Sequence, residues 1–86
     1  MPSISSFYGI TIYIYYNDHN EPHLHAIYGE YKGFISINSG VLLEGSLPPS
    51  AKKLIKEWIE KHTNELKEDW ELAKEHKKLK KIAPLK

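Results

Sequence analysis

Three of the five histidines, His19, His23 and His25, lie in one short segment of the chain. On an extended strand, His23 and His25 project from the same face with their Cα atoms about 6–7 Å apart, which is the arrangement of metal-binding His-x-His pairs. Asp18 or His19 from the adjoining turn could supply a third ligand, and Glu30 is a further candidate. Because the chain has no cysteine, such a metal would be a zinc-like divalent ion held by nitrogen and oxygen atoms.

The same two imidazoles, His23 and His25, could instead act as general acid and base, because the ordinary pKa of histidine lies closest to neutrality. Lys32 could stabilise a developing phosphorane, so this set could cleave RNA without a metal. Aromatic side chains on the same face would offer stacking surfaces for unpaired bases. These side chains are Tyr13, Tyr15 and Phe34.

A further interpretation assigns these residues no catalytic chemistry. Asp18 and His19 would cap the turn, and His23 and His25 would hydrogen-bond neighbouring backbone or side chains. The aromatic face would then be buried against a second copy of the chain or against another protein. The residues alone leave these interpretations open.

Alternating apolar residues predict the strands that position this segment. Residues 7–16 are expected to form one strand, with Ile10, Ile12 and Ile14 toward the core and the other face formed by Phe7, Thr11, Tyr13 and Tyr15. A strand over residues 23–28 is expected to turn at Gly29-Glu30 into a return strand, followed by a short strand over residues 41–44. In this register, His25 lies opposite Phe34 and His23 opposite Ser36, and both histidines fall on the less apolar face.

A helical arm should follow the strands, because Pro48-Pro49 is compatible with a helix start and later apolar residues form one stripe. Residues 49–76 are expected to form one long helix or two nearly collinear helices with a break near Thr63. His62 lies in the middle of the stripe and is expected to be a core histidine. The basic tail, residues 77–86, could lie against the domain through Leu79, Ile82 and Leu85.

The expected architecture is one α+β domain over residues 1–86. A four-stranded antiparallel meander within residues 7–45 is followed by a long or broken C-terminal helix, about residues 49–76, packed on one sheet face. The histidine and aromatic face is left for solvent, a partner or a substrate. The predicted core comprises Ile10, Ile12, Ile14, Leu24, Ile35, Ile37, Ile55, Trp58, Ile59, Leu66 and Trp70.

Composition narrows the possible partners. No stretch approaches the roughly 20 apolar residues of a membrane span, and the 86-residue chain has no cysteine, so a cytoplasmic protein is expected. Residues 1–47 carry one lysine against four acids, and all twelve basic residues of the chain are lysine. The guanidinium fork that reads guanine edges is therefore missing, which argues against sequence-specific DNA recognition.

Several segments line up with a known protein family: Phe-Tyr-Gly-Ile near the start, Asn-Asp-His-Asn-Glu-Pro-His-Leu-His-Ala-Ile-Tyr-Gly-Glu-Tyr in the middle, Gly-Ser-Leu-Pro before the helix, and Glu-Trp-Ile-Glu-Lys-His followed by Glu-Leu and Trp70. Over essentially its whole length, the chain resembles the small bacterial proteins of the domain of unknown function DUF4160. Glu21 stands where proline is common, and Leu24 where phenylalanine is common. The family has no established activity, so the resemblance implies no catalytic residues.

The resemblance also implies a genomic context, since members are often encoded beside another small uncharacterised protein in a layout like a toxin–antitoxin pair. The first expectation for function is one component of such a pair, with the His23 and His25 face cleaving or binding RNA. The alternatives are a non-enzymatic interaction module, acting as a homodimer or through a partner encoded nearby, and a His-x-His metal-binding protein. The first two of these functions need no cofactor. The third involves a zinc-like divalent metal ion.

Overall fold

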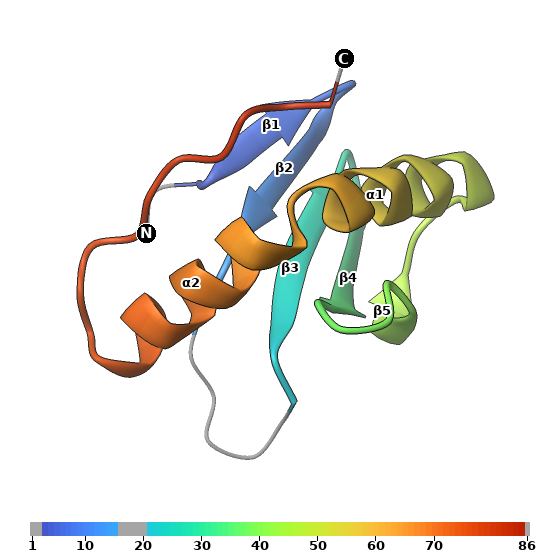
Figure 1. The fold of residues 1–86 in the computed structure, drawn as a ribbon. Coiled ribbons are helices and arrows are strands. Elements are labelled where there is room, and N and C mark those ends of the chain that lie inside the picture. The colour runs from blue at the N-terminus through green and yellow to red at the C-terminus, as the bar shows by residue number, and fades with distance from the viewer. Residues whose placement is uncertain (1–2, 16–20, 86) are drawn as a thin grey trace.

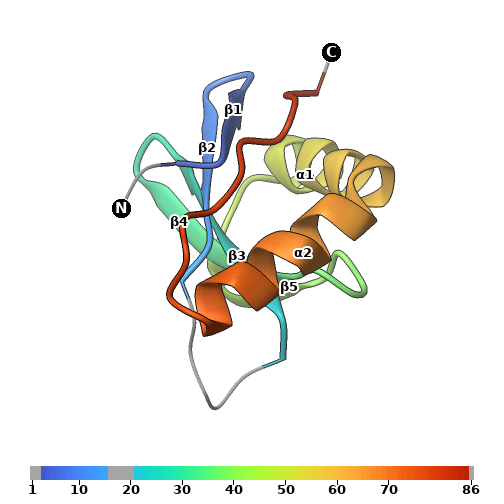
Figure 2. The ribbon, with the colours of Figure 1, turned by 60° about the vertical axis from the view of Figure 1, so that its left-hand side comes forward.

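The computed structural model describes residues 3–15 and 21–85, and within them an antiparallel sheet is followed by two helices (Figure 1). The strands lie in the sheet in their chain order. Both helices lie on one face of the sheet, as Figure 2 shows. The elements are β1 (Ser5–Phe7), β2 (Ile10–Tyr13), β3 (His23–Tyr28), β4 (Tyr31–Ser36), β5 (Leu42–Ser46), α1 (Pro49–Lys61) and α2 (Thr63–Lys74).

The predicted single strand over residues 7–16 is wrong, because Tyr8 and Gly9 form a turn between β1 and β2. Both residues have positive φ angles, 50° and 81°, as the two central residues of a type I′ hairpin turn do. The described sheet therefore has five strands rather than four. The turn also places Phe7 on the core face, where its ring centroid lies 5.2 Å from that of Trp58. The prediction that Phe7 lies on the aromatic face is therefore wrong.

The register of the central hairpin is confirmed. His25 pairs with Phe34, and His23 pairs with Ser36, around a turn in which Gly29 has a φ of 59°. The next strand, β5, differs from the predicted range of residues 41–44. Gly45, which follows the predicted range, lies within β5 at a φ of 92°, where a Cβ would clash with the carbonyl oxygen of Lys32.

The helical arm begins at Pro49 as predicted but consists of two helices that are not collinear (Figure 2). The break falls at His62, whose φ is −127°, and α2 ends at Lys74 rather than at residue 76. His62 is consequently half-buried rather than a core residue, and its Nδ1 lies 2.7 Å from Oε1 of Glu65. Neither described helix is long and apolar enough to span a membrane.

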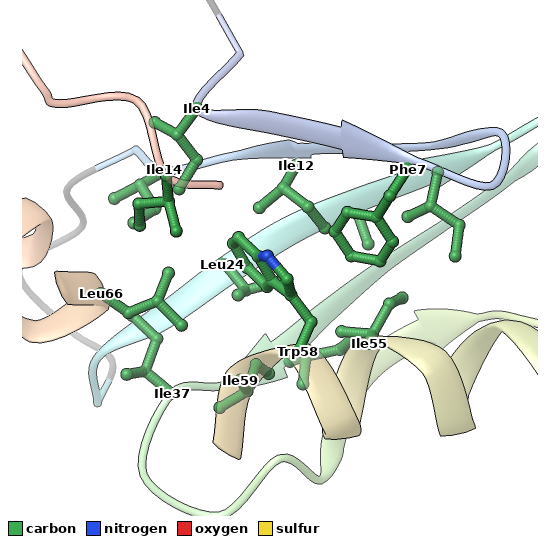
Figure 3. Close-up of a cluster of buried hydrophobic side chains, with 14 of the residues drawn as sticks. Ile4, Phe7, Ile12, Ile14, Leu24, Ile37, Ile55, Trp58, Ile59 and Leu66 are labelled. Carbon is green, nitrogen blue, oxygen red and sulfur yellow. The ribbon is translucent and has the colours of Figure 1, made fainter. Parts of the chain in front are cut away.

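The core lies between the sheet and the helices, and every predicted core residue is buried. Trp58 points from α1 into this core toward Phe7 (Figure 3). Its indole Nε1 donates a hydrogen bond to the carbonyl oxygen of Ala83 at 2.8 Å, and the backbone N–H of Ile82 donates to the carbonyl oxygen of Ile4 at 2.9 Å. The predicted contact of the tail with the domain is thus confirmed: Ile82 and Leu85 are buried, and Leu79 packs against the core.

Asp69 is a buried carboxylic acid on α2, 1% exposed. Its Oδ1 accepts a hydrogen bond from the backbone N–H of Lys80 at 2.9 Å. Its Oδ2 is buried and has no hydrogen-bond partner among the described residues. Burial raises the pKa of Asp69 above its ordinary value, and the hydrogen bond from Lys80 opposes this rise.

We expect Asp69→Asn to gain stability relative to the wild type as the pH rises. A raised pKa means that the folded state holds a proton that the unfolded state has already lost, so the contribution of Asp69 falls as the pH rises through the folded pKa. Asparagine keeps the acceptor for Lys80 and does not ionise. Urea unfolding between about pH 4 and pH 7 measures the difference. Glu57→Gln, an exposed carboxyl on α1, is the control, and a constant difference for Asp69→Asn would contradict the prediction.

Candidate functional site

The sheet face away from the helices carries a continuous group of rings: Tyr13, Tyr15, His25 and Phe34. We call these four side chains the ring cluster. Tyr13 of β2, His25 of β3 and Phe34 of β4 are direct neighbours in the register. The ring centroids are 6.0 Å apart for Tyr13 and Tyr15, 4.7 Å for Tyr15 and His25, and 4.2 Å for His25 and Phe34. All four side chains are half-buried, so the cluster forms a partly exposed aromatic surface.

His25 is the centre of the ring cluster. Burial lowers the pKa of His25 to about 4, and the nearby positive charges of His23 and Lys32 contribute in the same direction. Its Nε2 is buried and has no hydrogen-bond partner among the described residues. At neutral pH, His25 is therefore an uncharged ring packed against other rings.

His23 lies beside the ring cluster on the face expected to be left for solvent, a partner or a substrate, but its own side chain is buried. The residue is 2% exposed, and its ring centroid lies 5.3 Å from that of Trp70, because α2 brings Trp70 to the start of β3. Its Nδ1 lies 2.9 Å from the carbonyl oxygen of Glu21. A carbonyl only accepts hydrogen bonds, so Nδ1 of His23 carries a proton and donates it to the carbonyl oxygen of Glu21.

Sequence reasoning missed the polar contact that supports this corner of the sheet. Ser36 is fully buried, and its hydroxyl donates a hydrogen bond to Oε2 of Glu21 at 2.7 Å. The predicted pairing of His23 with Ser36 placed this hydroxyl next to the segment that leads into β3. That pairing could have predicted the hydrogen bond to Glu21, since a buried hydroxyl needs a partner. Glu21 therefore has a structural role at the start of β3.

The predicted metal ligands are not brought together as a set in the described part of the chain. The rings of His23 and His25 are adjacent, with centroids 5.3 Å apart. Glu30 lies in the turn at the opposite end of β3 from His23. Asp18 and His19 fall outside the described residues. Residues 3–15 and 21–85 contain no group of three or more histidine, aspartate or glutamate side chains that could hold a metal ion.

The predicted acid–base set is adjacent, but its groups are poorly placed for proton transfer. General acid–base catalysis needs a group whose pKa lies near the operating pH and which reaches the substrate. His25 has a pKa of about 4 and a buried Nε2, while His23 is buried and its Nδ1 is hydrogen-bonded. Lys32 is exposed on β4, two residues from Phe34. The site is therefore better suited to aromatic contact with a ligand than to proton transfer.

Comparison with known proteins identifies the family and nothing further. The model of the family described as "Domain of unknown function (DUF4160)" matches residues 9–71. No curated protein and no solved structure matches the chain. The matched segment contains the whole ring cluster together with His23 and Trp70. The chain belongs to the DUF4160 family.

Proposed function

We propose that this chain is a protein-interaction module that binds a small partner protein, encoded nearby, through the ring cluster. The observation that carries the proposal is that four aromatic side chains are in continuous contact on the side of the sheet opposite to the core residues Ile12, Leu24 and Ile35. Aromatic side chains are enriched in the cores of protein interfaces and among the residues that dominate binding energy. As the family resemblance suggests, the two proteins would form a cytoplasmic, toxin–antitoxin-like pair.

Charge favours a protein partner over RNA. The described residues 21–47 carry three glutamates, Glu21, Glu30 and Glu44, against the single cation Lys32. Nucleic acid binding depends on several cations that neutralise phosphates, and this part of the chain repels a polyanion. The lysines of the helices and the tail lie in residues 52–86, away from the rings in the sequence and, for the helices, on the opposite face of the sheet. The environment of the two histidines likewise favours binding over RNA cleavage.

The proposal predicts that Phe34→Ala or Tyr13→Ala weakens binding of the protein encoded by the adjacent gene by about tenfold or more, because each removes a central aromatic contact. Isothermal titration calorimetry with the two purified proteins measures the effect. Tyr31→Ala is the matched control: Tyr31 lies on the same strand as Phe34, is 46% exposed, and belongs to the opposite face. We expect this control to change the affinity by less than about twofold.

Three results would each refute the proposal. The first is equal loss of binding in Tyr31→Ala and Phe34→Ala, provided that circular dichroism shows both variants folded. The second is a homodimer that forms through Phe34 and leaves no free ring cluster, which light scattering on the purified chain detects. The third is growth arrest with RNA degradation when the chain is expressed alone, abolished by His25→Ala, which would establish the nuclease function instead.

A further inference from the structure

A carboxylate, that of Glu44, lies next to the ring cluster on the neighbouring strand β5. Glu44 of β5 is the direct register neighbour of Phe34, and Phe34 is the direct neighbour of His25. Cβ atoms of directly opposite residues in antiparallel strands are about 4.5–5.5 Å apart, so the Glu44 side chain stands next to the Phe34 ring. Glu44 is exposed and has no ion pair among the described residues. Tyr13, His25, Phe34 and Glu44 thus form one row across four strands.

The electrostatics of this row suit a cation. The faces of aromatic rings carry partial negative charge, and the carboxylate of Glu44 adds a full negative charge at one end. His25 adds a ring without adding a positive charge, because burial keeps it neutral at physiological pH. Among the described strand residues of this face, the other charged one is Lys32, which pairs with Ser46 rather than with Glu44 in the register. The carboxylate of Glu21, which leads into β3, lies at Ser36 on the other side of Phe34. Lys32 repels a cation on its own side and leaves the Glu44 side as the favourable position.

We infer that the partner protein places an arginine side chain on this row, with its guanidinium against the Phe34 ring and its charge beside the Glu44 carboxylate. This inference rests on the proposed function, since it names the chemistry that the same face recognises. Arginine suits the site better than lysine, because its planar, weakly hydrated guanidinium stacks on aromatic rings and pairs with carboxylates through two hydrogen bonds. An acidic segment would meet both the rings and Glu44 with the wrong charge.

The test uses defined peptides, so that it does not depend on the partner. Acetyl-Gly-Arg-Gly-Arg-Gly-amide is titrated into the ¹⁵N-labelled chain and followed by NMR. The matched probe carries citrulline in place of both arginines and has the same shape without the charge. We expect the arginine peptide to shift the amide signals of Tyr13, His25, Phe34 and Glu44, and the citrulline peptide to bind at least about fivefold more weakly.

Charge variants locate the binding position. Glu44→Lys is expected to weaken binding of the arginine peptide at least about fivefold, since it replaces attraction by repulsion beside the ring. Lys32→Gln is expected to strengthen it by about twofold. Glu30→Lys is the control, because it makes the same change of charge in the turn about 13 Å along the strand from Phe34, beyond the screening length of about 8–10 Å in physiological salt.

The possible results separate this inference from the proposed function. Equal binding of the two peptides, equal weakening by Glu44→Lys and Glu30→Lys, or signal shifts confined to the helices would each overturn the arginine site. Partner binding that is lost in Phe34→Ala but unchanged in Glu44→Lys would also overturn it while supporting the proposed function. Conversely, specific peptide binding without any partner binding would support the cation site and refute the proposed function.

Discussion

Replacing Trp58 with alanine is expected to lower the free energy of unfolding by about 3–5 kcal/mol. Trp58 is completely buried and packs against Phe7 with ring centroids 5.2 Å apart, so the substitution leaves a large cavity between α1 and the sheet (Figure 3). It also removes the donor that holds the tail at the carbonyl oxygen of Ala83. Domains of this length are stable by only about 4–13 kcal/mol, so Trp58→Ala is expected to lose a large fraction of the total and to unfold at a clearly lower urea concentration. Urea titration followed by circular dichroism measures the loss.

Trp58→Phe separates packing from hydrogen bonding. It keeps an aromatic ring in the core but loses the indole N–H, so the expected loss is smaller, about 1–2 kcal/mol. Because that N–H holds the tail, hydrogen exchange of the Ile82 amide, which donates to Ile4, should accelerate more than exchange of amides in β3. If Trp58→Phe is as damaging as Trp58→Ala, the hydrogen bond to Ala83, and not the packing, dominates the contribution of Trp58.

The central sheet was predictable because two independent signals agree there. Alternating isoleucines identify the core face, and Gly29 fixes the register by which His25 faces Phe34. The turn at Tyr8 and Gly9 was missed because a tyrosine with positive φ is uncommon, and the apolar alternation continues on both sides of it. A two-residue turn changes which face the preceding residue occupies. This is why Phe7 lies in the core rather than beside Tyr13.

The environment of the candidate site was less predictable, because it depends on contacts between distant parts of the chain. Period-two alternation correctly placed His23 opposite Ser36 in the register. That alternation contained no information about Trp70, which contacts His23 from α2, the helix that follows the break at His62. No glycine or proline marks this break. The side chain of Thr63 instead donates a hydrogen bond to the carbonyl oxygen of Ile59 at 2.8 Å, a local contact that often accompanies a bend in a helix.

His25→Phe is expected to protect the protein against acid. The folded-state pKa of His25 is about 4, against an ordinary value of 6.5, so between these values the unfolded state binds a proton that the folded state does not. The wild type therefore loses stability as the pH falls from about 6.5 to about 4, by about 1–2 kcal/mol once the partial exposure of the ring is allowed for. Phenylalanine keeps the ring contacts and cannot be protonated. Its stability advantage over the wild type should grow by this amount between about pH 7 and pH 4.5 in urea unfolding experiments.

His25→Asn is the control that separates titration from packing. It also lacks the titrating ring, so its stability should show the same reduced loss in acid, but without the ring contacts to Tyr15 and Phe34 it should be less stable than His25→Phe at every pH. Parallel curves for the wild type and His25→Phe, or an NMR titration that places the His25 pKa near 6.5, would contradict the prediction. A His25 pKa above about 7.5 would make the ring positively charged at neutral pH and would repel the arginine inferred for the ring cluster. The same titration therefore also tests the electrostatic basis of that inference.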